Sequence, residues 1–208
     1  IDSNGQYQGK NEKGDYKYCD SITTRNMCGV FNITQDGLVS EKDFEIEYNK
    51  KLDCYYSGTE DIRIMSFGDK LEFTGNKISH YTNYHDLTLH IEHGFLNLEL
   101  QKASSCLLDI ENKRRVEKNW VLFPSNGETY IIYQWFPIKL FKLDNSDKKD
   151  TVFNDDLEHQ NVSLFKTIPT PYYFRDVRGS TNGIEVDGEI WFLTHLVSYE
   201  SKRYYYHI

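Results

Sequence analysis

The strongest constraint on the fold is a hairpin pattern that recurs at nearly equal intervals. Each copy has a polar stretch, an apolar run, a turn that contains glycine, and a second apolar run. The turn glycines Gly68, Gly127 and Gly188 lie about 60 residues apart, slightly more than the roughly 40 to 50 residues of common propeller blades. A glycine turn between two apolar runs is typical of a β-hairpin. The pattern therefore predicts a fold built from repeated antiparallel units.

The copies occupy residues 58–75, 118–133 and 178–195, and a shorter copy precedes them between residues 16 and 33. The first of the three full copies carries the most distinctive polar entrance. There Glu60, Asp61 and Arg63 stand together where the apolar run begins. We expect each copy to form a hairpin with its polar residues at one end.

Most of the remaining chain also reads as strand. Residues 44–48 alternate strictly, which predicts a half-buried strand. Residues 87–93 and 95–100 predict a second hairpin around Gly94, made of the outer strands of one four-stranded sheet. Further strands are predicted at residues 107–110, 135–143 and 162–168, and Pro137 indicates a bend or an edge. No apolar stripe of helical period appears, so the predicted class is all-β.

Successive four-stranded antiparallel sheets are typical of a β-propeller, in which each blade packs on the next. We expect an exposed lead-in at residues 1–15 and a propeller domain over residues 16–208, with about four blades of a five-bladed ring. The acidic residues 144–156 predict a long exposed loop. The chain lacks an initiator methionine and ends within a predicted strand. We therefore expect a fragment or a processed form, with a missing segment or a partner chain that completes the ring.

The composition excludes several partners. With a net charge of -8 and a pI near 5.4, the chain is not expected to bind nucleic acid or an anionic membrane. No apolar run approaches the length of a membrane-spanning helix. Aromatic residues make up 15% of the chain, and 16 of them are tyrosines. A neutral ligand such as a sugar stays open, because tyrosine combines an apolar ring with a hydroxyl.

The four cysteines, Cys19, Cys28, Cys54 and Cys106, have irregular spacings and no C-x-x-C pair. They predict neither a zinc site nor a disulfide framework, so we expect free thiols and an intracellular or virion-associated protein with no metal and no cofactor. The sequons at Asn32 and Asn161 would matter only in a secretory compartment.

Residues 58–63 fit the pattern G-x-E-D-x-R and resemble the signature of the five-bladed β-propellers of mannoside phosphorylases and related glycoside-acting proteins. Residues 178–183 and 191–195, with Tyr199 and Glu200, look like segments of uncharacterised propeller domains that accompany glycosyltransferases in large DNA viruses and some bacteria. The resemblance implies a propeller whose general acid matches Asp61. The family's phosphate-holding residues have no clear counterparts here.

In a propeller, the starts of the inner strands converge at the mouth of the channel. The residues expected at that mouth are Arg25, Glu60, Asp61, Arg63, Lys118, Asn119, Arg175, Asp176, Arg178 and His195. This mixed-charge ring suits a neutral or lightly charged glycan, with or without phosphate. In the structural alternative, Glu60, Asp61 and Arg63 form ion pairs that fix one blade to the next.

Two functions are compatible with this site. One is a glycoside hydrolase or phosphorylase with Asp61 as general acid and Arg63 orienting it. Adjacent strand residues point to opposite faces, so a hydrolase would need a second carboxylate from Asp176 or Glu200. The other is a non-catalytic module that binds glycans or proteins within a larger viral or glycosyltransferase-associated protein.

Two further groups have weaker signals. Among Trp120, Trp135 and Trp191, which could stack on a sugar, we expect at least two to lie in the core. The histidines at positions 80, 85, 90 and 93 are better explained as surface-loop residues than as a metal site.

Overall fold

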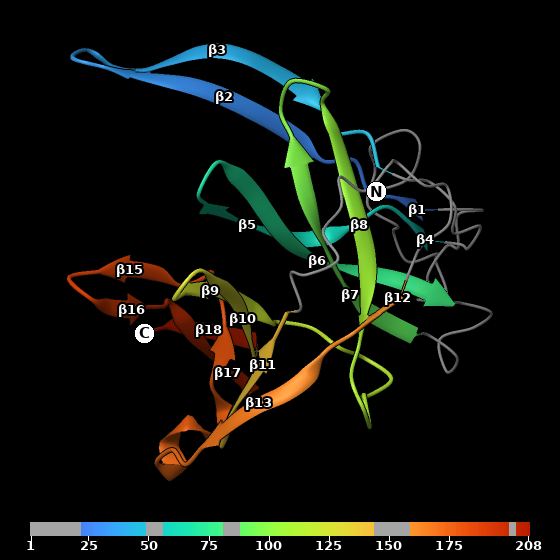
Figure 1. Cartoon of the computed structure of the whole chain (residues 1–208), viewed down its shortest axis with the longest axis vertical. Coiled ribbons are helices and arrows are strands. Elements are labelled where there is room, and N and C mark those ends of the chain that lie inside the picture. The colour runs from blue at the N-terminus through green and yellow to red at the C-terminus, as the bar shows by residue number, and fades with distance from the viewer. Residues whose placement is uncertain (1–21, 49–55, 81–87, 144–158, 200–202) are drawn as a thin grey trace, which may run out of the picture.

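The computed structural model describes residues 22–48, 56–80, 88–143, 159–199 and 203–208, and these residues form an all-β structure (Figure 1). Within this part of the chain the one helical element is the 3₁₀ turn η1, Tyr172–Asp176. The predicted all-β class is confirmed. No described sheet closes on itself, and the propeller remains a prediction. The predicted lead-in and acidic loop lie outside the described residues.

The largest sheet, here called the first sheet, has the strand order β12-β8-β7-β6-β5. Its four consecutive strands form an antiparallel meander, and β12 joins β8 in parallel. The bounds are β5 Glu60–Phe67, β6 Lys70–His80, β7 Thr88–Asn97, β8 Lys102–Asp109 and β12 His159–Asn161. The turn at Gly68 between β5 and β6 confirms the first predicted hairpin.

The second sheet is antiparallel throughout and has the order β13-β11-β10-β9. Its bounds are β9 Val121–Ser125, β10 Glu128–Trp135, β11 Ile138–Lys142 and β13 Ser163–Ile168. The hairpin predicted around Gly127 and the strand predicted at residues 162–168 are confirmed.

The C-terminal part holds a third sheet, of order β14-β17-β18, and the separate hairpin β15-β16. Their bounds are β14 Arg178–Gly179, β15 Ile184–Val186, β16 Glu189–Trp191, β17 Thr194–Tyr199 and β18 Arg203–His207. The turn at Gly188 joins β15 to β16, as predicted.

The N-terminal hairpin consists of β2 Met27–Thr34 and β3 Gly37–Glu45. It extends from the body of the molecule in Figure 1, and residues 31 to 43 are exposed. Two short strands, β1 Ile22–Thr23 and β4 Tyr56–Ser57, pair in parallel nearby. The alternation predicted at residues 44–48 holds for Phe44 and Ile46, which are buried, although β3 ends at Glu45.

Three apolar cores lie between successive layers. The N-terminal hairpin packs on one face of the first sheet through Phe44, Phe73 and Leu96. The opposite face packs on the second sheet through Met65, Trp120, Leu122 and neighbouring residues. The second sheet then packs on the C-terminal segments through a further cluster that includes Val121, Trp135 and Phe192. The layers therefore follow one another in chain order.

Three predicted strands have the wrong bounds, and the one predicted at residues 107–110 is the end of the longer strand β8. Strand β7 runs straight through Gly94, so residues 87–93 and 95–100 do not form a hairpin. It pairs with β6 on one side and with β8 on the other. Gly94 is needed for packing, because a Cβ atom there would lie 2.2 Å from the carbonyl oxygen of Ser104. The single strand predicted at residues 135–143 is split between β10 and β11, with a cis peptide bond between Phe136 and Pro137 in the connection. The bend that Pro137 indicated is therefore a chain reversal.

Candidate functional site

The registers of the three repeated hairpins define equivalent positions in the repeats. The residues that close the turns are Phe67 with Lys70, Ser125 with Glu128, and Val186 with Glu189. Counting back six residues from the first member of each pair gives Asp61, Asn119 and Ser180. These three residues stand at the same distance from the turn in each hairpin, at or just before its first strand.

All three equivalent positions meet at one side chain, the guanidinium of Arg63. Its Nη1 donates to the backbone oxygen of Asp61 at 3.1 Å, its Nη2 to Oδ1 of Asn119 at 3.4 Å, and its Nε to the backbone oxygen of Ser180 at 2.9 Å. Arg63 thus joins three segments that lie far apart in the sequence. The predicted grouping of Asp61, Arg63 and Asn119 is present.

The backbone at two of these positions is left-handed, with φ of 52° at Asp61 and 63° at Asn119. Asp and Asn adopt this conformation more readily than other residues that carry a Cβ atom. It interrupts the strand alternation, and the register of β5 against β6 shifts between Glu60 and Arg63. Both Glu60 and Asp61 are exposed.

The Asp61 carboxylate is held by a buried neighbour. Asn76 of β6 is only 3% exposed, and its Nδ2 donates to Oδ2 of Asp61 at 3.1 Å. The Oδ1 atom of Asn76 has no hydrogen-bond partner in the structure. One carboxylate oxygen of Asp61 is therefore oriented from within the sheet, and the residue faces solvent. Sequence reasoning missed Asn76, and its place directly opposite Glu60 across the hairpin was the available signal.

His195 lies beside the third of the equivalent positions. Its Nδ1 lies 2.8 Å from Oγ of Ser180, and its backbone pairs with Arg178 across β14 and β17. The imidazole is buried, and Arg178 is half-buried. Through Ser180, His195 is connected to Arg63. Lys118, next to Asn119, is exposed.

Two predicted members of the ring are engaged elsewhere. Arg25 forms an exposed ion pair with Glu45 at 2.5 Å, at the base of the N-terminal hairpin. Asp176 pairs with Arg175, its neighbour in η1, at 3.0 Å. Each of these ion pairs satisfies both of its charges, so neither Arg25 nor Asp176 needs a partner beside Arg63. No contact in the described residues connects Arg25, Arg175 or Asp176 to Arg63.

The electrostatics of the centre depend on burial. Burial lowers the pKa of the Arg63 guanidinium from its ordinary value, and the nearby Asp61 carboxylate acts in the opposite direction. The pKa stays far above neutrality because arginine remains protonated in proteins. Among the described residues no carboxylate forms an ion pair with Arg63. The centre is therefore a half-buried cation held by neutral oxygens, which differs from the ion-pair arrangement considered in the structural alternative.

The other candidates have separate environments. Trp120 and Trp135 are buried, as expected for two of the three tryptophans, and Trp191 is 58% exposed. The surface-loop prediction is wrong for His90 and His93, which are buried in β7. His93 contacts buried Glu72, and His90 lies near Lys113 and Asp109. His85 lies outside the described residues. No group of three or more His, Cys, Asp or Glu side chains in the described ranges is arranged to hold a metal ion.

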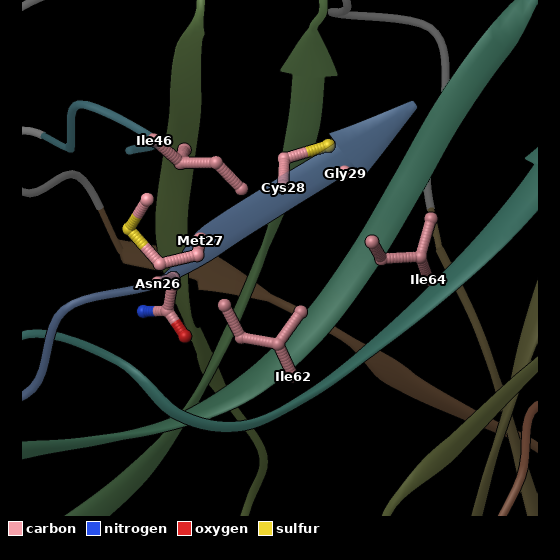
Figure 2. A pocket seen from close by; sticks show the side chains of 7 residues that line it. All are labelled: Asn26, Met27, Cys28, Gly29, Ile46, Ile62 and Ile64. Atoms are coloured by element: carbon pink, nitrogen blue, oxygen red, sulfur yellow. The ribbon is translucent and has the colours of Figure 1, made fainter. Parts of the chain in front are cut away.

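An apolar groove that the sequence did not indicate lies between the N-terminal hairpin and β5 (Figure 2). Its volume is about 370 Å³, and its lining residues are Asn26, Met27, Cys28, Gly29, Ile46, Ile62 and Ile64. Cys28 and Cys106 carry free thiols, and Cys19 and Cys54 lie outside the described residues. Ile62 and Ile64 belong to the same strand as Arg63, but neighbouring strand residues point to opposite faces, so the groove lies on the face of β5 away from the Arg63 contacts.

The described part of the chain contains no helix that is long and apolar enough to cross a membrane. In the comparisons with known proteins, neither the protein-family models nor the curated proteins yield a match to this chain.

Proposed function

We propose that this chain is a glycan-binding β-propeller domain whose binding site lies around Arg63. The observation that carries the proposal is the convergence of Asp61, Asn119 and Ser180 on one guanidinium. In a propeller, equivalent positions of successive inner strands approach a common axis. Three repeats that present the same position to one point support such an axis. The proposed blades are the first sheet, the second sheet and the C-terminal segments.

The chemistry at this point suits polyhydroxylated ligands. Asp61 and Glu60 offer exposed carboxylate acceptors, and Lys118 offers an exposed donor close to Asn119. Asn76 fixes one oxygen of Asp61, which reduces the ordering cost when a ligand hydroxyl binds. Hydrogen bonds to charged acceptors are stronger than those between neutral groups. The site therefore favours sugar hydroxyls, with a neutral or lightly charged glycan as ligand.

Binding is favoured over catalysis because hydrolysis needs two carboxyl groups at a defined separation. Asp176, one candidate partner of Asp61, pairs with Arg175 in η1, and Glu200 lies outside the described residues. Among the described residues, one side chain donates a hydrogen bond to the Asp61 carboxylate, and it is the amide of Asn76. We therefore propose the module over the hydrolase, and turnover in the presence of phosphate tests the phosphorylase.

A glycan array followed by calorimetry with mannobiose tests this function. The chain is expected to bind at least one glycan, and Asp61→Asn is expected to weaken that binding by at least tenfold with an unchanged melting temperature. Asparagine tolerates the left-handed backbone at this position, so the variant isolates the charge. The matched control is Asp69→Asn, which removes an exposed carboxylate in the turn at the other end of the same hairpin.

Two results would contradict the proposal. If no glycan binds, the site has another role. If the chain releases product from aryl glycosides or from mannobiose, with or without phosphate, and Asp61→Asn abolishes that turnover, the enzyme function replaces the module.

A further inference from the structure

The face of β5 that lines the groove is the uncovered half of a packing surface that is buried elsewhere in the molecule. By the hairpin registers, Ile62 and Ile64 are equivalent to Trp120 and Leu122. Trp120 and Leu122 are 2% and 0% exposed, because the first sheet covers them. Ile64 is 49% exposed, and it borders the groove. On this face the first repeat is covered only in part, by the N-terminal hairpin, whereas the first sheet covers the second repeat fully.

The opposite half of the same packing surface is uncovered at the C-terminal end. Met65 of β5 is 6% exposed and packs against the second sheet. Its equivalent in the third repeat is Ile184 of β15, which is 63% exposed. The strand partner of Ile184 is Trp191, the exposed tryptophan. The third repeat thus presents an apolar face with no following layer among the described residues.

We propose that a second copy of the chain covers these surfaces, with the third repeat of one copy packed on the first sheet of the other. The inference rests on the proposed propeller arrangement. The two uncovered halves correspond to the two sides of the buried interface between the first and second sheets, so the contact continues an interface that the fold already uses. Two such contacts, related by a twofold axis, close two copies into one ring.

The free strand edges support the same assembly. Among the strands that the structure describes, β2 pairs with β3 alone, and the third sheet ends at β18. A two-stranded hairpin is marginally stable by itself, and an exposed edge offers unpaired N–H and C=O groups to another strand. The third repeat of a second copy, packed on the first sheet, would lie next to the N-terminal hairpin, because β2 lines the same groove as β5. The second copy would then also complete the ring around Arg63.

Sedimentation equilibrium without any glycan tests the proposal. The chain is expected to show twice its monomer mass of 24.6 kDa at micromolar concentration. Ile64→Asp and Ile184→Asp are each expected to give monomers, and both replace exposed side chains, so circular dichroism should show an unchanged fold. The control Leu164→Asp changes a residue of β13 that is 52% exposed and lies outside both surfaces, and it should stay dimeric.

Mixing the two disrupted variants distinguishes a contact between the third repeat and the first sheet from a contact of each surface with the same surface of the other copy. An Ile64→Asp copy keeps an intact third repeat, and an Ile184→Asp copy keeps an intact first sheet. Their mixture should therefore recover a dimer through one intact contact, although neither variant associates alone. An interface in which each surface packs on the same surface of the other copy would show no such recovery, because every contact in the mixture would then contain one substituted residue. Absence of recovery overturns the proposed packing.

Cys28 gives a readout at the groove itself. Its thiol should react slowly with a maleimide in the dimer and at least tenfold faster in Ile64→Asp, as measured by peptide mapping. A wild-type chain that is monomeric up to 100 µM, or a Cys28 that reacts equally in both proteins, overturns the inference. These measurements need no ligand, so a failure of the assembly and a failure of glycan binding are separate results.

Discussion

Arg63 donates from Nε to the backbone oxygen of Ser180 at 2.9 Å, and the two residues lie 117 positions apart in the sequence. The bond joins the first sheet to the C-terminal segments at the point where Asn119 of the intervening repeat also contacts the guanidinium. Long-range contacts at a single charged side chain couple the local stability of three repeats. Arg63 is therefore expected to have a structural role in addition to any role in binding.

Replacing Arg63 with methionine should lower the free energy of unfolding by about 2–3 kcal/mol, because three oxygens lose a charged donor. Urea denaturation monitored by tryptophan fluorescence measures this loss. The matched control is Arg175→Met, which breaks an exposed pair with Asp176 and should cost less than about 1 kcal/mol. Equal losses in the two variants would show that the convergence on Arg63 carries no special energy.

Replacing Gly94 with alanine should destabilise the chain by about 3 kcal/mol, because the new Cβ atom would overlap a backbone oxygen of β8 that cannot move freely. The same change at Gly127 should cost only about 1 kcal/mol. That turn has open space around it, and the cost there comes from a φ of 76° alone. Thermal denaturation of both variants gives the comparison. A larger loss at Gly127 would contradict the packing argument.

The contrast between these glycines shows what the sequence could predict. Turn glycines are marked by neighbouring polar residues and by apolar runs on both sides, so the hairpins at Gly68, Gly127 and Gly188 were predictable. Gly94 lies within an alternating run. A side chain is excluded there by the backbone oxygen of Ser104, which belongs to another strand. A close approach between strands leaves no local pattern, so β7 was divided at the wrong place.

The candidate site was partly predictable for the same reason. Asp61 and Asn119 follow from the repeat, because equivalent positions in a repeated fold share surroundings. Arg25 and Asp176 were assigned to the ring by position alone, and each has an acidic or basic partner close by in space. Asn76 was missed because its role depends on a cross-strand contact with Asp61.

The environment of His90 predicts a pH dependence of stability. Burial lowers the pKa of His90 from its ordinary value, the charge of Lys113 lowers it further, and Asp109 acts in the opposite direction. His159 and Lys77 also face this region. The unfolded chain therefore takes up a proton on this imidazole more readily than the folded chain does. The contribution of His90 to stability should be intact above its unfolded pKa and should fall as the pH drops below about 6.5.

Urea denaturation of the wild type and of His90→Gln between about pH 7.5 and 5 measures this effect. The variant should lose less stability on acidification. The control is His207→Gln, which changes an exposed imidazole and should follow the wild type. The Asp109 carboxyl contributes in a lower range. Burial acts to raise its pKa, but hydrogen bonds and charge from Lys113 and His159 lower it overall. Its share of stability is therefore lost only in more acidic solution.

The last prediction concerns the buried pair beneath the entrance to the candidate site. The ammonium of Lys77 lies 3.1 Å from Oε1 of Glu92, and the two side chains are 5% and 0% exposed. Glu92 also accepts hydrogen bonds from the hydroxyls of Thr59 and Ser105. Thr59 directly precedes Glu60, so this network fixes the segment from which the carboxylates of the site extend.

Replacing Lys77 with methionine should cost about 3–5 kcal/mol, because Glu92 keeps its charge in a buried position without its cation. The double variant with Glu92→Met should recover part of that loss, since no unpaired charge remains. Recovery should stay incomplete, because the hydroxyls of Thr59 and Ser105 then lose their acceptor. The matched control is Lys142→Met, which breaks a half-exposed pair with Glu128 and should cost less than about 1 kcal/mol. Urea denaturation of the wild type, Lys77→Met, Glu92→Met and the double variant completes the cycle, and a coupling energy near zero would show that Lys77 and Glu92 act independently.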